Sequence, residues 1–164
     1  MARADAPQFA FRLQGKFVQY LDSAGNLLWD CDIDRLVLVA EFISDEVPHG
    51  ERHFLVFWSF EDQELHRALA TTRAEGVTEM LLGLSQHWKN DLRLELSPDD
   101  QKPKDWQSRV LWPPELAGHI YLTEEELPPT TWKQKVRRRM AGPIMQWFPT
   151  EEVSEYLRRF KPDF

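Results

Sequence analysis

Two neighbouring segments of the chain are apolar at almost every position, and they limit the possible folds more than any other feature. Residues 36–43 read LVLVAEFI and residues 53–60 read HFLVFWSF, joined by a polar loop that contains Pro48 and Gly50. A strand with one face in water alternates apolar and polar side chains, whereas these segments are largely apolar on both faces. They predict a central antiparallel pair covered on both sides, by a helix or by a second layer of sheet.

The flanking sequence predicts further strands. Residues 16–21 and 27–31 are strand-like and are separated by DSAGN, whose side chains supply the hydrogen bonds and positive φ that a tight turn needs. Residues 64–71 have an ambiguous pattern that allows one more strand. In residues 92–96 leucines alternate with charged residues, which predicts a half-exposed strand.

A first helix is predicted after these strands. Thr72 and Glu75 have the spacing of a capping box, in which each side chain satisfies a backbone N–H at the start of a helix. Apolar residues then recur at helical spacing from Val77 to Trp88. This stripe predicts a helix that lies on the sheet.

Two more helices are predicted at the C-terminus. Thr131 and Gln134 form a second capping box, and Gly142–Pro143 supplies a stop. Thr150 is expected to cap the last helix. The apolar stripe of that helix consists of Val153, Tyr156, Leu157 and Phe160.

The segment before the C-terminal helices has a different character. Residues 97–129 contain six prolines, each of which lacks a backbone donor and fixes φ. Trp106 and Trp112 lie among them, and such large apolar side chains are better hidden than exposed. These features predict an irregular segment strapped across the body.

Together these elements predict one α+β domain over residues 1–164, within the usual size of a domain. It would contain a curved antiparallel sheet of about five to seven strands, one packed helix and a C-terminal helical pair. Its parts are a strand-rich body (1–96), the irregular strap (97–129) and a basic helical tail (130–164). A strand meander that leads into a helix resembles the layout of pleckstrin-homology-like domains in fold order, and this resemblance implies a half-barrel. No motif residue supports membership of that family.

The sequence also favours a cytoplasmic location. No apolar signal-peptide core follows the first residues, and the longest apolar runs, such as Leu36–Ala40, are five residues long, far short of a membrane span. The single cysteine, Cys31, cannot form an internal disulfide, which fits a reducing compartment.

The net charge of −7 is divided unevenly along the chain. Residues 1–130 carry 23 acidic and 12 basic side chains, whereas residues 131–164 carry 4 acidic and 8 basic. The basic tail could pack on the acidic body, or it could meet an acidic partner. Because the whole chain is acidic, nucleic acid is not the expected partner.

Two clusters have residue types that can bind metals. Asp30, Asp32 and Asp34 flank Cys31 at alternate positions, but alternate residues of a strand do not converge on one point and the distal ligands of a calcium loop are absent. His49 and His53 lie in or beside a loop, with no zinc pattern to complete a site. No metal or cofactor is therefore expected.

The sequence contains no catalytic motif. GxSxG, Walker and GxGxxG patterns are all absent, so an enzyme is not the favoured interpretation. An acid–base site in which His66 or His119 meets a nearby carboxylate remains the alternative.

The favoured hypothesis is a non-catalytic protein-interaction module, such as a small subunit or adaptor. Aromatic and arginine side chains are typical of binding hot spots, and the tail is rich in both. Phosphate or nucleic-acid binding by KQKVRRR is a further alternative, and self-association into a homo-oligomer stays open. The candidate partner surface consists of Trp132, Arg137, Arg138, Arg139, Trp147 and Arg158.

Overall fold

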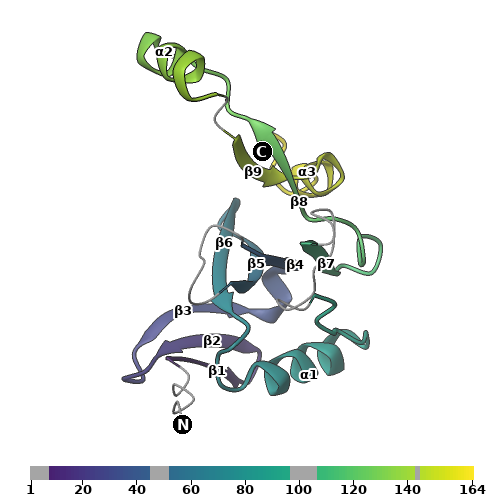
Figure 1. The fold of residues 1–164 in the computed structure, drawn as a ribbon. Helices are drawn as coiled ribbons and strands as arrows, with labels where there is room; N and C mark the ends of the chain where they lie inside the picture. The colour runs from purple at the N-terminus through teal and green to yellow at the C-terminus, as the bar shows by residue number, and fades with distance from the viewer. Residues whose placement is uncertain (1–7, 45–51, 97–106, 143–144) are drawn as a thin grey trace.

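The computed structural model describes residues 8–44, 52–96, 107–142 and 145–164. Within these ranges the strands are β1 (Phe9–Gln14), β2 (Phe17–Asp22), β3 (Leu27–Asp32), β4 (Leu36–Ile43), β5 (His53–Glu61), β6 (Glu64–Thr71), β7 (Ser108–Trp112), β8 (Leu122–Glu126) and β9 (Met145–Pro149). The helices are α1 (Val77–Trp88), α2 (Trp132–Ala141) and α3 (Glu151–Arg158), with a short 3-10 turn η1 (Ile33–Arg35) before β4. Figure 1 shows their arrangement.

The strands form three antiparallel sheets. The first has the order β1-β2-β3, the second β6-β5-β4-β7, and the third is the β8–β9 hairpin. The predicted turn between β2 and β3 is present, and the Asp22 carboxylate accepts hydrogen bonds from the N–H groups of Ala24 and Asn26 at 2.9 Å each. The α+β class with antiparallel sheets is therefore confirmed. No sheet closes among the described strands, and the half-barrel is not confirmed.

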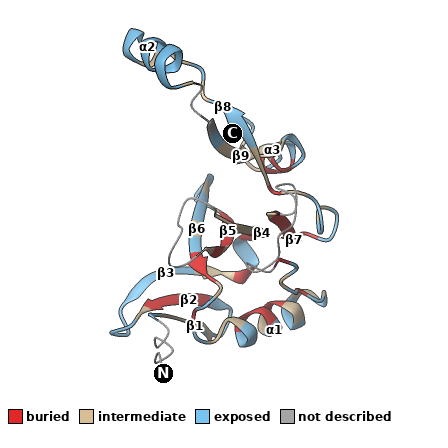
Figure 2. Ribbon diagram, in the orientation of Figure 1, coloured by how far each residue is buried: buried red, intermediate tan, exposed pale blue. Residues whose placement is uncertain are grey.

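The predicted central pair is the middle of the second sheet, and both of its faces are covered (Figure 2). The first sheet and α1 cover one face, where Val39, Leu55 and Phe57 are buried. On the other face Leu38, Val56 and Trp58 pack against the residues of α3. Both of the predicted kinds of cover are thus present, a sheet with a helix on one face and a helix on the other.

The start of α1 differs from the prediction. The helix begins at Val77 behind Gly76, which has a φ of 78° and makes no side-chain cap. A side chain at position 76 would also approach the backbone oxygen of Phe11 to 2.8 Å. The Thr72 hydroxyl donates to the carbonyl of His53 instead, so the predicted Thr72–Glu75 capping box is wrong. The apolar stripe is confirmed, with Met80, Leu81 and Leu84 buried.

Residues 92–96 do not form the predicted strand. Leu92 and Leu96 are buried and alternate with exposed charged residues, as the pattern indicates, but the segment pairs with none of the described strands. The N–H groups of Glu95 and Leu96 donate instead to the carboxylate of Glu41, at 2.8 and 2.5 Å. A buried side chain thus occupies the donors that a neighbouring strand would otherwise use.

The strap is more regular than the prolines predict. β7 pairs with β4 at the edge of the second sheet, and β8 begins the third sheet, so the prediction of an irregular segment is wrong for these residues. The prolines at 113, 114, 128 and 129 lie between the strands rather than inside them. Trp112 stacks on Trp88 of α1 at 4.2 Å between ring centroids. Residues 97–106, including Trp106, lie outside the described ranges.

The two C-terminal helices have separate environments. α3 buries Val153, Tyr156 and Leu157 against the second sheet. α2 has no buried residue, and Figure 1 shows it far from α3 at the end of the β8–β9 hairpin. The expected helical pair is therefore not a packed pair, because β9 separates the helices and the stripe of α3 faces the body.

Candidate functional site

The β8–β9 hairpin is a stem that carries α2 away from the body. Its strands pair from Leu122 opposite Pro149 to Glu126 opposite Met145. The base of the stem is fixed to the body, since the N–H of Leu122 donates to the hydroxyl of Ser108 on β7 at 3.0 Å. Five strand residues span about 17 Å. The stem is therefore long enough to keep α2 out of contact with the four-stranded sheet (Figure 1).

Local sequence explains why a helix forms at the end of this stem. The Gln134 N–H donates to the Thr131 hydroxyl at 3.2 Å, and the Gln134 side chain accepts from the Thr131 N–H at 3.3 Å. This confirms the predicted capping box. Gly142 ends the helix with a φ of 85°, and its N–H donates to the carbonyl of Arg138 at 2.9 Å.

α2 exposes an apolar stripe to water. Trp132, Val136 and Met140 are spaced four residues apart, so they lie within about 80° of one another around the helix. Their exposed fractions are 71%, 44% and 84%. Apolar stripes of this kind normally face a core or a partner. Within the described residues nothing covers this one.

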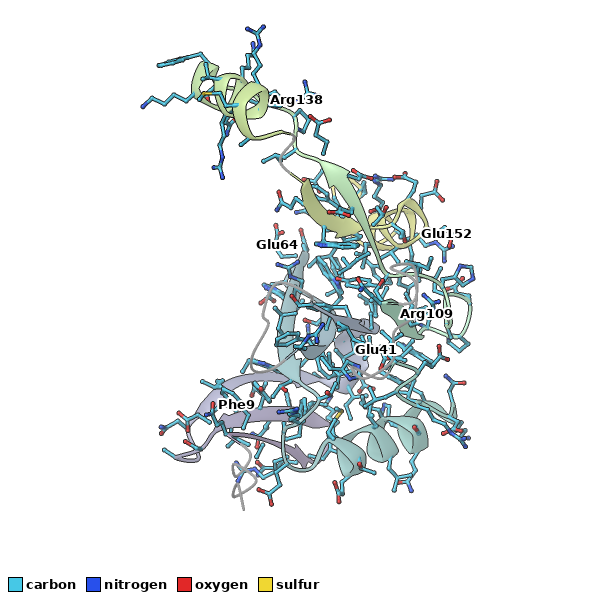
Figure 3. All side chains as sticks on the ribbon, viewed as in Figure 1. Phe9, Glu41, Glu64, Arg109, Arg138 and Glu152 are labelled. Carbon is cyan, nitrogen blue, oxygen red and sulfur yellow. The ribbon has the colours of Figure 1, made fainter. Side chains whose placement is uncertain are left out.

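Basic side chains border the stripe on both sides. At 100° per residue, Lys135 and Arg139 lie along one border and Lys133 and Arg137 along the other. All four are exposed. Arg138 lies on the opposite side of the helix and pairs with Glu126 of the stem, and Figure 3 labels it on the projecting helix. α2 is thus an amphipathic helix whose narrow apolar stripe has cationic borders.

The structure does not gather all the predicted surface residues in one place. Trp132, Arg137, Arg138 and Arg139 share α2. Trp147 lies on β9 and is half-buried at the wall of a cavity against the second sheet. Arg158 lies on α3, where it donates to Glu151 at 2.8 Å. Only Trp132, Arg137 and Arg139 therefore form a continuous candidate surface, since Arg138 lies on the opposite side of α2.

The other basic residues of the tail bind the acidic body. Lys161 lies 2.7 Å from Glu64 of β6, and Arg159 lies 3.4 Å from Glu115. Docking of the tail on the body thus applies to the chain from α3 onward. The cations of α2, apart from Arg138, face water.

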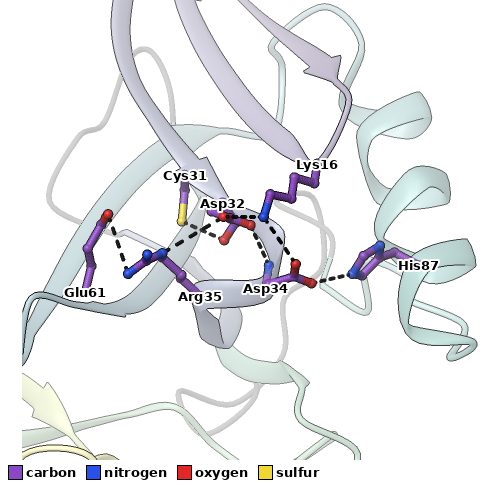
Figure 4. A network of polar contacts seen from close by, with 7 residues as sticks. All are labelled: Lys16, Cys31, Asp32, Asp34, Arg35, Glu61 and His87. Carbon is purple, nitrogen blue, oxygen red and sulfur yellow. Dashed lines mark hydrogen bonds and ion pairs between the residues drawn. The ribbon is translucent and has the colours of Figure 1, made fainter.

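Asp32 and Asp34, beside Cys31, belong to a network of ion pairs and hydrogen bonds (Figure 4). The Lys16 ammonium lies 3.1 Å from Asp32 and 3.6 Å from Asp34, and His87 lies 3.0 Å from Asp34. Burial acts to raise the pKa of Asp32, but the hydrogen bond from the Asp34 N–H and the Lys16 ammonium outweigh it, and the pKa falls below its usual value. No cluster of ligand residues that could hold a metal is found in the described parts of the chain.

Cys31 has the properties of an inert thiol. Burial first, and then the charges of Glu61, Asp32 and Asp30, raise its pKa to about 11, against a hydrogen bond with Ser59 that lowers it. The thiolate is the reactive form of cysteine. Cys31 is therefore a poor nucleophile at neutral pH.

Of the two histidines considered for catalysis, His119 is the one that meets a carboxylate among the residues the structure describes. Its Nδ1 lies 2.5 Å from Glu152, beside an open hollow that Arg109 and Thr150 also line. Both members of the pair are well exposed, and the Thr150 hydroxyl is engaged with Ile120. His66 is exposed on β6. His49 lies outside the described ranges.

Sequence reasoning missed a buried acid. Glu41 is completely buried on β4, and its second carboxylate oxygen faces His53 Nε2 at 3.5 Å. Its other oxygen accepts hydrogen bonds from the N–H groups of residues 95 and 96. The Glu41–His53 pair therefore lies inside the body beneath that segment. One charged residue in an otherwise apolar central strand was the signal that could have identified it.

The structure contains no helix long and apolar enough to cross a membrane among the residues it describes. Comparison with protein-family models, with curated proteins and with solved structures finds no match to this chain.

Proposed function

We propose that this protein is a non-catalytic interaction module that binds another protein through α2. The exposed stripe of Trp132, Val136 and Met140 carries the proposal. Helices of this kind bind by placing their apolar face in a groove of the partner. Tryptophan and arginine are also the residues most enriched at binding hot spots. The partner is a protein with an apolar groove and acidic residues along its rim.

The charges on the stem and on α2 favour a protein over an extended polyanion as the partner. Glu124, Glu125 and Glu126 are exposed on the stem next to the cations of α2. A flat anionic membrane or a long nucleic acid would meet these carboxylates together with the cations. A groove that takes only the helix meets the apolar stripe and its basic borders. The same charges make the KQKVRRR segment a weaker candidate for phosphate binding.

The His119–Glu152 pair supports an enzymatic function less well. The pair could move a proton, but it is open to water, and Thr150, the hydroxyl residue in its lining, already donates to a carbonyl. General acid–base groups act best in a site that excludes water and positions a reacting atom. In this proposal we place the chain in the cytoplasm, where the single Cys31 would stay reduced.

The test begins with a photo-crosslinking residue at position 136, which identifies the protein that contacts α2 in cells. The purified partner is then titrated with the wild type and with the triple variant Trp132→Ser, Val136→Ser, Met140→Ser. Loss of a tryptophan hot spot and its neighbours should weaken binding at least about 100-fold. Lys133→Gln with Arg137→Gln should slow association and flatten its salt dependence.

The matched control replaces exposed apolar residues of the body. Leu27, Leu28 and Leu82 are exposed by 50%, 50% and 57%, and their serine variants should bind the partner as the wild type does. Equal affinity of the α2 triple variant and the wild type would refute the proposal. Stronger binding to phosphatidylserine vesicles or to duplex DNA than to any protein would refute it as well.

A further inference from the structure

A cavity of about 230 Å³ lies between the second sheet and the base of the β8–β9 stem. Its walls come from β4, β5 and β6 on one side and from the first residues of β8 together with β9 on the other. The apolar part of the lining consists of Phe42, Ile43, Val56, Leu69, Leu122 and Trp147. An apolar protein cavity of about 150 Å³ holds one benzene ring. This cavity therefore has room for a ring and a short substituent.

The polar part of the lining provides donors, among them one unpaired cation. Arg67 lies 5.9 Å from the ring centroid of Trp58, on the neighbouring strand, and forms no ion pair with any residue the structure describes. Carboxylates are absent from the described lining of the cavity. Arg67 is exposed to solvent, and no acid stands in the described lining, so its guanidinium is free to form charge-assisted hydrogen bonds with an anionic ligand in the cavity.

Two hydroxyl groups add donors to the same wall. The oxygen of Tyr121 accepts from Trp58 Nε1 at 2.9 Å and is hydrogen-bonded by the Arg67 side chain. The oxygen of Ser108 accepts from the N–H of Leu122 at 3.0 Å. A hydroxyl that already accepts from the protein has its own proton left to donate. Burial raises the pKa of Tyr121, so its proton stays in place at neutral pH.

We propose that this cavity binds a small free carboxylic acid with an aromatic or branched apolar group. The apolar group would lie between Val56, Leu69 and Trp147, and the carboxylate would accept from Arg67 and Tyr121. Pockets of this composition, apolar with a few converging polar groups, are the usual form of small-ligand sites. The site is separate from the stripe of α2, so it does not depend on the proposed partner.

The test titrates the protein with phenylacetate and follows backbone and indole N–H resonances by NMR. Saturable shifts are expected at Trp147, Leu69 and Val56, with a dissociation constant of about 1 mM, as suits a ligand of this size. The neutral analogue phenylacetamide should bind at least tenfold more weakly, because it cannot form the charge-assisted bond to Arg67.

Three variants locate the ligand in the cavity. Arg67→Gln should weaken phenylacetate binding about tenfold, since one charge-assisted hydrogen bond is lost. Leu69→Trp changes an exposed wall residue and should block the cavity while the protein stays folded. Arg93→Gln is the matched control, because Arg93 is exposed and pairs with Asp91 far from the lining. It should bind as the wild type does.

The outcomes separate this proposal from its alternatives. Absence of saturable shifts, equal binding of acid and amide, or an unchanged affinity in Arg67→Gln would each overturn it. Tighter binding of a peptide that ends in phenylalanine than of phenylacetate would overturn the assignment to a free acid. The α2 triple variant should bind phenylacetate normally, so failure of one proposal leaves the other measurable.

Discussion

The two helices of the basic tail, α2 and α3, both have an apolar stripe, yet one is covered and the other is bare. Val153 and Leu157 of α3 are completely buried, whereas Trp132 and Met140 of α2 are 71% and 84% exposed. The difference comes from position. α3 follows the base of the stem and packs on the second sheet, while α2 lies at the far end of the stem. An apolar stripe predicts that one face of a helix will be covered. The segments that connect the helix to the rest of the chain determine whether the body or a separate partner covers it.

The largest expected contrast is in the effect of truncating the two stripes. Leu157→Ala leaves a cavity between α3 and the second sheet and should lower the free energy of unfolding by about 2–5 kcal/mol. Met140→Ala removes side-chain atoms that are already in water, and the change should stay within about 0.5 kcal/mol. Urea unfolding followed by tryptophan fluorescence measures both. Similar losses in the two variants would show that α2 is packed on the body.

A polar contact of α3 should also stabilise the fold more than a polar contact of α2. The Tyr156 hydroxyl donates to the carbonyl of Val37 at 2.8 Å, and Tyr156→Phe should cost about 1 kcal/mol because a buried acceptor loses its donor. Arg138→Gln breaks the exposed pair with Glu126, which should contribute only about 0–0.5 kcal/mol. The same unfolding curves give both values. A larger loss in Arg138→Gln would reverse the comparison.

Capping residues should separate local from global stability. Thr131→Ala removes the capping box of α2 and should destabilise that helix by about 1 kcal/mol. The midpoint of global unfolding should not move, because the helix contributes no buried surface. Amide NMR shifts of residues 132–141 report the loss of helix. A lower global midpoint would mean that α2 belongs to the cooperative unit.

The smallest expected effect is a loss of stability in alkali that involves α3 and not α2. Burial, helped by Glu115 and opposed by Arg159, raises the pKa of Tyr156 above its usual 10.0. A raised pKa in the folded state means that stability is complete below pH 10 and falls as the pH rises through the folded value. Tyr121 and Cys31 shift in the same direction. The fall between pH 9 and 11 should be shallower in Tyr156→Phe, and an equal fall would exclude a contribution from Tyr156.

The sequence predicts the elements of this fold better than their partners. The central pair and the stripes of α1 and α3 follow from periodicity, because residues that share a face must be buried together. The Thr131 capping box can also be predicted from the sequence, since it depends on two residues that are three positions apart. Strands β7, β8 and β9 could not be predicted in this way, because their pairing partners lie far along the chain and the prolines suggest irregular structure. Position 72 shows the same limit, as its hydroxyl bonds to residue 53 instead of a nearby backbone group.

The candidate site was predictable only in part. The residues of α2 could be identified from one basic, Trp-containing helix, but their exposure depends on the stem that carries them. The cavity beside Arg67 and Tyr121 could not be predicted, because its walls come from strands distant in sequence that meet only in the folded chain.

Amide hydrogen exchange of the free protein tests the central claim most directly. Helices shorter than about 12 residues are marginal without packing, so the amides of α2 should exchange within about tenfold of the unfolded rate. The hydrogen-bonded amides of α3 should exchange orders of magnitude more slowly, near the rate set by global unfolding. This result would establish that α2 projects from the folded body without packing on it. Protection of residues 135–141 equal to that of α3 would contradict it.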